Sequence, residues 1–124
     1  MQLASWQSQV RKGAAELVVL NLLARAPRHG SAILDCVSGG IISEGTLYPL
    51  LARLEREGKI SGRWVVEDHS RSPRKVYHVL RAGEEMLTAM NQFWHEFSQL
   101  VSASIEGELH VGLKLGSGTV PQRP

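Results

Sequence analysis

The sequence predicts a mainly α (α+β) fold, in which three helices precede a β hairpin and a long final helix. Residues 9–58 contain three segments with helical apolar spacing, interrupted at Pro27 and at the glycine pair 39–40. Residues 60–80 change to β-branched and aromatic residues around a polar turn, and residues 82–105 return to helical spacing. This order of elements is that of a winged helix-turn-helix followed by a C-terminal helix.

Length and composition limit the classes of function. A chain of 124 residues with 43% hydrophobic content can form one modest core. No run approaches the roughly 20 apolar residues of a membrane helix, and the first residues lack the order of a secretory signal. Because no apolar run is long enough to cross a membrane, we expect no membrane partner. Cys36 is the single cysteine, so we expect no internal disulfide and a reducing, cytoplasmic setting. We expect Cys36 to be a small buried helix residue rather than a redox sensor.

The first two helices are expected to supply much of the core. Residues 1–8 are predicted to form an arm or a short helical turn, and the first full helix to run from Gln9 to Arg25. Pro27 should end it, because proline disfavours helical geometry in the residue before it. A second short helix is expected from Gly30 to about Val37.

The third helix is expected between Ser43 and Gly58. Its leucines stand at i, i+3, i+4 and i+7, which places them on one face, and they are Leu47, Leu50, Leu51 and Leu54. Ser43 suits the N-cap and Gly58 a left-handed C-cap. The other face combines hydroxyl, aromatic and basic groups: Thr46, Tyr48, Pro49, Arg53 and Arg56. Taken alone, the helix is equally compatible with an ordinary surface helix whose arginines are solvated.

Charge is distributed unevenly along the chain, although the net charge is only +2. Residues 53–81 carry eight basic residues, Arg53, Arg56, Lys59, Arg63, Arg71, Arg74, Lys75 and Arg81, against four acidic ones. Residues 84–108 carry five acids and no lysine or arginine. A basic middle and an acidic end predict one surface for a polyanion and another for a different partner.

The basic surface is predicted to bind double-stranded DNA. In a winged helix, the third helix enters the major groove and the hairpin tip contacts the backbone or the minor groove. Thr46 and Pro49 suit base edges, whereas the arginines suit phosphates. Tyr48 either reaches a phosphate or packs against the wing, and Lys75 is alternatively a structural strand residue in front of a buried Tyr77. The predicted DNA-binding set is Ser43, Glu44, Thr46, Tyr48, Pro49, Arg53, Arg56, Arg71, Arg74 and Lys75.

The final helix, from Ala82 to about Ile105, carries a heptad pattern. Apolar residues recur in steps of four and three, flanked by further apolar residues at sevens. We expect this seam to form a homodimer, although packing within one chain is the alternative. The predicted interface consists of Met86, Met90, Phe93, Phe97, Leu100 and Val101. From Gly107 onward, four glycines and two prolines predict a disordered tail.

Several strings of residues resemble the PadR family of transcriptional regulators, in its short form with a single C-terminal helix. They are Pro-Arg-His-Gly at 27–30, Glu-Gly-Thr-Leu-Tyr-Pro at 44–49, Pro-Arg-Lys-Val-Tyr at 73–77 and Ala-Gly at 82–83. The resemblance covers residues 10 to about 105. It implies a homodimeric repressor whose wings and third helices grip a two-fold symmetric operator.

The resemblance also implies an effector, since family members of this kind respond to phenolic acids, drugs or other aromatic compounds. Phe93, Trp94 and Phe97 lie within five residues, and two indoles across a dimer axis can stack on a flat ligand. These three residues are the tentative ligand site. The alternative interpretation is that they form the aromatic core of the dimer seam.

An enzyme is not expected. The five histidines are scattered, and the chain shows no H-x-x-x-H pair, glycine-rich phosphate loop or metal-ligand spacing. We therefore expect no catalytic residues, no metal and no cofactor. The competing hypothesis is a winged-helix module that binds proteins and has no specific affinity for DNA. The expected organisation is a DNA-binding domain at 1–81, a dimerisation helix at 82–106 and a flexible tail at 107–124.

Overall fold

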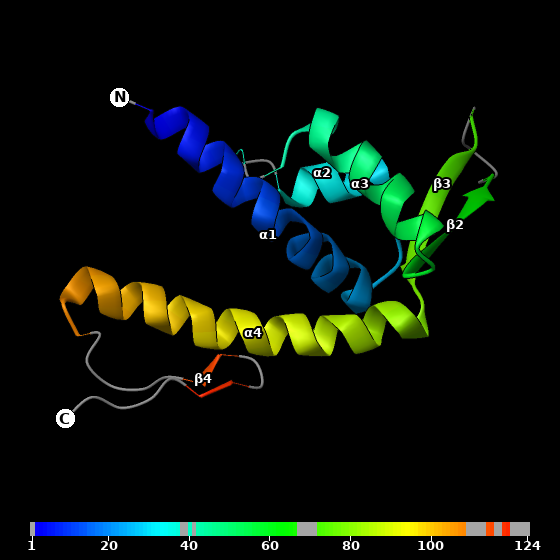
Figure 1. The fold of residues 1–124 in the computed structure, drawn as a ribbon. Coiled ribbons are helices and arrows are strands. Elements are labelled where there is room, and N and C mark those ends of the chain that lie inside the picture. Colours follow the sequence, from blue (N-terminus) through cyan, green and yellow to red (C-terminus); the bar gives the residue numbers. More distant parts are fainter. Residues whose placement is uncertain are drawn as a thin grey trace. The chain divides into compact units, whose positions relative to one another are not determined.

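A computed structural model gives the fold and describes residues 2–37, 40, 42–66, 72–108, 114–115 and 118–119. The helices are α1 (Leu3–Arg25), α2 (Gly30–Cys36), α3 (Glu44–Arg56) and α4 (Arg81–Glu106). The strands are β1 (Arg28–His29), β2 (Ile60–Val65), β3 (Arg74–Val79), β4 (Lys114–Leu115) and β5 (Gly118–Thr119) (Figure 1). The predicted winged helix-turn-helix with a long final helix is confirmed.

The chain divides into two compact units, Met1–Glu85 and Met86–Pro124, and each is described by itself. The first contains the winged helix-turn-helix and the start of α4, and the second contains the rest of α4 and the β4–β5 pair. The three-part division expected from the sequence stays a prediction.

Helix α1 begins earlier than expected. It starts at Leu3 rather than at Gln9, so of the two alternatives expected for residues 1–8 the arm is wrong for residues 3–8, which are helical but continuous with the first helix. Residues 3–12 contain no glycine or proline, and a helix that has already nucleated extends at little cost. At the other end Ala26 is extended, as Pro27 predicts, and the Arg28 side chain donates to the Leu22 carbonyl at 3.2 Å.

The core of the first unit is made by the first three helices and β2. Its largest fully buried side chains include Leu20 of α1, Ile33 of α2 and Ile60 of β2. The predicted leucine stripe of α3 is confirmed, since Leu47, Leu51 and Leu54 are 0% exposed and Leu50 is 8% exposed. The apolar face of α3 is therefore fully used inside this unit.

Cys36 lies on the surface rather than in the core, which corrects the expectation for this residue. Helix α2 has only seven residues and turns Ile33 and, at its C-cap, Val37 inward. Cys36 falls between these two buried positions on the outward side, and its sulfur lies 3.7 Å from an Arg28 guanidinium nitrogen.

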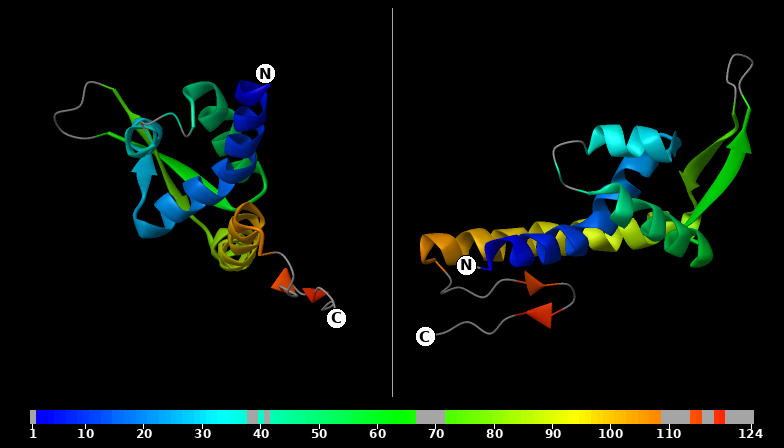
Figure 2. Two further views of the ribbon diagram at one scale, coloured as in Figure 1. Left: turned by 90° about the vertical axis from the view of Figure 1, so that its left-hand side faces the viewer. Right: turned by 90° about the horizontal axis from the view of Figure 1, so that it is seen from above.

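The sheet has the antiparallel order β1-β3-β2. Strand β1 is too short to leave a periodic signal and was not predicted; it pairs Arg28 with Tyr77 and His29 with Val76. Strands β2 and β3 pair from Ile60↔Val79 to Val65↔Arg74 and extend beyond the helices as a wing (Figure 2). Tyr77 lies in the central strand, where burial raises its pKa.

Two glycines are required, one by its backbone conformation and the other by close packing. Gly58 has φ +75°, which confirms the predicted left-handed C-cap of α3. A Cβ on Gly83 would collide with the backbone carbonyl of Lys59, so the first turn of α4 packs directly on the turn before β2.

In the second unit, α4 keeps large apolar side chains exposed. Phe93 is 47% exposed, Trp94 43%, Phe97 37% and Val101 43%. Beyond α4, the pairs Lys114↔Thr119 and Leu115↔Gly118 form a short ladder, and the expected flexible tail stays a prediction. The rest of the expected tail after Glu108 lies outside the described residues.

Candidate nucleic-acid interface

The outward side of α3 presents the polar and basic residues that its sequence pattern predicts. Tyr48, Pro49 and Arg56 are exposed, and Thr46 is half-buried. Pro49 lies within the helix and provides no N–H group, so the carbonyl of Gly45 lacks its usual intrahelical partner. With the leucines buried, this side of α3 is available for a partner.

The first turn of α3 differs from the predicted capping arrangement in one respect. Ser43 occupies the N-cap, and its carbonyl accepts from the backbone N–H groups of Thr46 at 3.1 Å and Leu47 at 2.9 Å. Its hydroxyl does not cap the helix but donates to Thr46 Oγ1 at 3.2 Å. Glu44 is exposed in the first turn.

Gly45 is a candidate that the sequence reasoning missed. A Cβ built there would meet nothing closer than the Ser43 hydroxyl at 4.0 Å, so alanine would fit and would favour the helix. A glycine at an exposed helical position without a packing reason is consistent with close approach of a ligand. The Glu-Gly-Thr string at residues 44–46 is the sequence signal from which Gly45 could have been identified.

Tyr48 packs on α2. A Cβ on Gly30 would lie 2.7 Å from the Tyr48 ring, so the ring rests on the backbone of Gly30. This contact joins two strings that the sequence analysis singled out separately, His29-Gly30 and the start of α3. Because Tyr48 is still 40% exposed, packing on Gly30 and contact with a partner are compatible.

Arg53 belongs to a ring of four alternating charges. It bonds Glu16 of α1 at 2.7 Å and Glu57 at 3.2 Å, and Lys59 bonds the same two carboxylates at 3.3 and 3.1 Å. The hydrogen bond that Arg53 donates to Glu16 raises the pKa of Arg53, and the one that Lys59 donates to Glu57 lowers the pKa of Glu57. The ring fastens the end of α3 to α1, and contact of Arg53 with phosphate stays a prediction.

Lys75 is held by α3 as well. Its ammonium lies 2.9 Å from Glu55 Oε1, and the other Glu55 oxygen accepts from the backbone N–H of Gly62 at 3.0 Å. The bond from Lys75 lowers the pKa of Glu55, and the same bond raises the pKa of Lys75. The ammonium also lies 6.0 Å from the ring centre of Trp64 and 5.4 Å from that of Tyr77. The alternative role of Lys75 as a structural strand residue is favoured by these contacts.

Arg74 stands at the start of β3 with its guanidinium 3.1 Å from His29 Nε2. His29 Nδ1 accepts from the backbone N–H of Ala32 at 3.2 Å, and an accepting Nδ1 places the proton of a neutral imidazole on Nε2. The role of Nε2 in its contact with Arg74 depends on the His29 tautomer. Among the described residues no carboxylate lies within 4.0 Å of Arg74, so its N–H groups can donate to a phosphate.

The other predicted basic residues divide into two groups. Within the part of the chain that the structure describes, Arg56 and Arg63 are exposed and have no carboxylate within 4.0 Å. Arg71 lies outside the described residues. The basic groups open to a partner are therefore Arg56 of α3 and Arg63 and Arg74 of the wing.

Metal-ligand clusters and membrane-spanning helices are both absent from the described residues. Among them, no group of three or more histidine, cysteine, aspartate or glutamate side chains has the arrangement of a metal site. None of the described helices combines the length and the apolar character that crossing a membrane requires.

The second unit contains the aromatic cluster predicted as a ligand site. The rings of Phe93 and Phe97 stack with centroids 5.4 Å apart and an interplanar angle of 13°, and Trp94 lies 6.4 Å from Phe97 at 54°. One face of the cluster is exposed on α4. This geometry suits both a dimer seam and a flat ligand.

Comparison with known proteins identifies the family. Residues 19–89, more than half of the chain, match the family described as transcriptional regulator PadR-like. The transcriptional regulator Rv3488 of Mycobacterium tuberculosis is 32% identical over 114 residues, which cover 90% of this chain and 98% of that protein.

Solved structures agree with this match. The crystal structure of a PadR family transcriptional regulator from Eggerthella lenta has a TM-score of 0.72 at 31% identity and covers 84% of this chain and 92% of that one. A PadR-like transcriptional regulator from Bacillus cereus has a TM-score of 0.69 at 31% identity, with 81% and 99% covered. The chain therefore belongs to the PadR-like family of transcriptional regulators.

Proposed function

We propose that this regulator is a homodimeric, sequence-specific DNA-binding repressor. The observation that carries the proposal is the division of α3 into a fully buried leucine face and an exposed face with Thr46, Pro49 and Arg56. That exposed face adjoins a wing whose Arg74 lies 3.1 Å from His29 Nε2 and, among the described residues, has no carboxylate within 4.0 Å. A helix and a wing that expose these residues can bind the major groove and the flanking phosphate backbone.

The residues of the interface take different roles in this proposal. Thr46 and Pro49, in the first half of α3, contact base edges, with the proline ring suited to a thymine methyl group. Tyr48, Arg56 and Arg74 contact phosphates. The same role is assigned to Arg71 from its place in the sequence. Ser43 and Glu44 flank the base contacts, whereas Arg53 and Lys75 mainly hold the geometry of α3 and the wing.

The same chain is proposed as its own partner through α4. Met86, Phe93, Phe97 and Val101 are each between 37% and 47% exposed, and exposed apolar side chains that form a patch mark interaction surfaces. A two-fold dimer places two α3 helices on successive turns of the major groove, about 34–36 Å apart. A symmetric operator follows from this geometry.

Release from DNA is proposed to depend on a small aromatic effector. The stacked pair of Phe93 and Phe97 with the tilted Trp94 offers flat faces on which such a ligand can stack. Since these residues also belong to the proposed seam, a ligand there changes the spacing of the two α3 helices.

The test is fluorescence anisotropy with a labelled duplex from upstream of the protein's own gene, against a scrambled duplex, at two salt concentrations. Arg56→Ala combined with Arg74→Ala should weaken specific binding at least about tenfold, because charge-assisted contacts are lost. The matched control is Arg25→Ala combined with Arg81→Ala, which removes the same charge away from α3 and the wing.

The outcomes separate the candidate functions. Specific, salt-sensitive binding that only the first variant weakens supports the repressor. Equal weakening by both variants would show that net charge, rather than this face, controls affinity. Absence of binding at low salt would contradict the proposal and favour a module that binds proteins.

A further inference from the structure

A polar hollow lies between α1 and the start of α3. Of the predicted DNA-binding residues, only Ser43 and Thr46 line it. It has a volume of about 120 Å³ and is lined by Ser8, Arg11, Lys12, Gly40, Ser43 and Thr46. A water molecule occupies about 30 Å³ in the liquid, so the hollow has room for a group of several heavy atoms. Every side chain that lines it is a cation or a hydroxyl.

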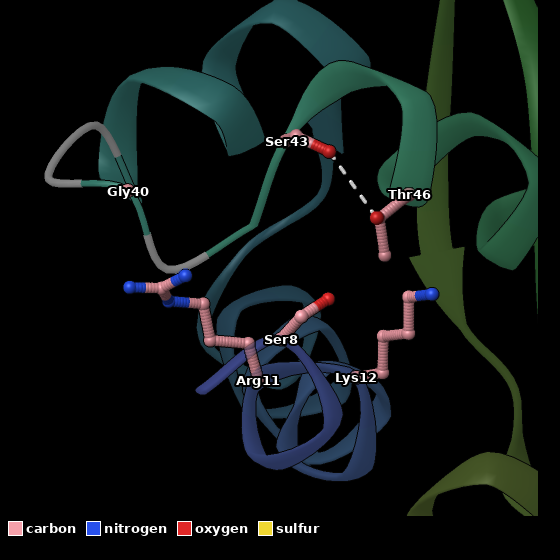
Figure 3. Close-up of a pocket in the computed structure, with 6 residues that line it drawn as sticks. All are labelled: Ser8, Arg11, Lys12, Gly40, Ser43 and Thr46. Atoms are coloured by element: carbon pink, nitrogen blue, oxygen red, sulfur yellow. Dashed lines mark hydrogen bonds between the residues drawn. The ribbon is translucent and has the colours of Figure 1, made fainter. Parts of the chain in front are cut away.

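The lining side chains come from two helices and from Gly40. Ser8, Arg11 and Lys12 share one side of α1, and in Figure 3 Ser8 lies between the other two, with the Arg11 guanidinium extending toward Gly40 and the Lys12 ammonium extending to the opposite side. The Ser43 hydroxyl donates to Thr46 Oγ1, which leaves the Thr46 O–H as a donor. Ser43 and Thr46 belong to the first turn of α3, where the helix dipole is positive.

The two cations have no acidic partner in the part of the chain described by the structure. The next carboxylate along α1, Glu16, is already bound by Arg53 at 2.7 Å and by Lys59 at 3.3 Å. Arg11 and Lys12 are both exposed, and their adjacent like charges favour an anion between them.

We propose that this hollow binds a phosphate group, with Arg11 and Lys12 as the charged clamp and Ser8 and Thr46 as hydroxyl donors. Tetrahedral phosphate offers several acceptor oxygens, and a mixed set of cations and hydroxyls satisfies them from different directions. This assignment rests on the proposed function. In the proposed DNA complex, the bound phosphate group is a backbone phosphodiester beside the groove that α3 enters. A free phosphorylated molecule is the other source of the same chemistry.

The test compares Arg11→Ala/Lys12→Ala with the charge-matched control Arg25→Ala/Arg81→Ala in duplex binding across a salt series. Loss of a phosphate contact should weaken binding at least about tenfold relative to the control and lower the salt-dependence slope by about 0.9 per chain. The exchange Arg11→Lys/Lys12→Arg keeps both charges and should restore most of the affinity. Thermal melting of each variant checks that the fold is retained.

A second arm titrates inorganic phosphate into the protein without DNA and follows backbone amide signals of Ser8, Lys12 and Thr46. Saturable shifts that the double variant lacks, together with the duplex effect, assign the site to the operator backbone. Shifts without a duplex effect assign it to a free phosphorylated ligand. If neither arm responds, the phosphate site is wrong. If no protein binds the duplex, the proposed function fails and the phosphate arm alone decides this inference.

Discussion

Lys75 Nζ lies 2.9 Å from Glu55 Oε1, and this bond ties the wing to the last turns of α3. The two residues stand on β3 and α3, and the same carboxylate also accepts from Gly62 of β2. The side chain of Lys75 crosses over Gly62, where a Cβ would collide with it. The orientation of the wing relative to α3 therefore depends on one glutamate.

Glu55→Gln should destabilise the protein by about 1 kcal/mol at neutral pH, since glutamine keeps an acceptor for Gly62 but loses the charge that Lys75 binds. Both side chains are about one third exposed, at 30% and 32%, so screening keeps the effect small. Chemical denaturation of both proteins measures it. Glu85→Gln, which breaks the exposed pair with Arg81, is the control and should change stability by less than about 0.5 kcal/mol.

The same pair predicts a pH dependence. The folded pKa of Glu55 is below its ordinary value of 4.5, so its contribution is complete above that pH and disappears as pH falls through the folded value. The folded pKa of Lys75 is above 10.5, so its contribution is lost only as pH rises beyond that. The gap in the free energy of unfolding between wild type and Glu55→Gln should therefore disappear at acidic pH. A gap that does not narrow as the pH falls below 4.5 would contradict the pairing.

Gly83→Ala and Gly13→Ala should have opposite effects, although both replace a helical glycine with the best helix former. A Cβ at Gly83 meets the Lys59 carbonyl, which cannot move without disturbing the turn, and the expected cost is about 1–3 kcal/mol. A Cβ at Gly13 meets nothing within 4 Å, and the expected gain is up to about 1 kcal/mol. Thermal unfolding of the two variants checks both signs; a stabilised Gly83→Ala would refute the packing argument.

Gly45→Ala should separate stability from function. The protein leaves space for the methyl group, so the free energy of unfolding should rise by up to about 1 kcal/mol. If DNA approaches the first turn of α3 closely, the same methyl group should weaken duplex binding by about tenfold, a loss of about 1.4 kcal/mol. Gly13→Ala serves as the control, with a stability gain and unchanged affinity. Undiminished binding by Gly45→Ala would place the duplex farther from α3.

Phe93→Glu should disperse the proposed dimer, because a carboxylate in an apolar seam has no partner and its burial is costly. Gln99→Glu adds the same charge on the opposite side of α4 and should leave the mass unchanged. Sedimentation equilibrium of both variants measures the result. A Phe93→Glu protein that still sediments as a dimer would exclude this seam as the interface.

The sequence by itself determined the elements whose signals are local. The spacing of Leu47, Leu50, Leu51 and Leu54 predicted the buried face of α3, and Gly58 its left-handed end, because both depend on residues within a few turns. The switch from helical spacing to β-branched residues after Gly58 predicted the wing in the same way. Strand β1 and the helical start of α1 carried too weak a signal, since one has two residues and the other only helix propensity.

Only the tertiary structure decided which cations are engaged and which are open to a partner. Arg53 is paired with Glu16 across 37 positions, and Lys75 with Glu55 across 20, so no periodicity in the sequence reports these bonds. The position of Arg11 and Lys12 around the same hollow as Ser43 and Thr46 likewise depends on how α1 crosses α3. A run of basic residues fixes the charge of a region, whereas the distances between helices and strands decide which of those charges remain available to an external anion.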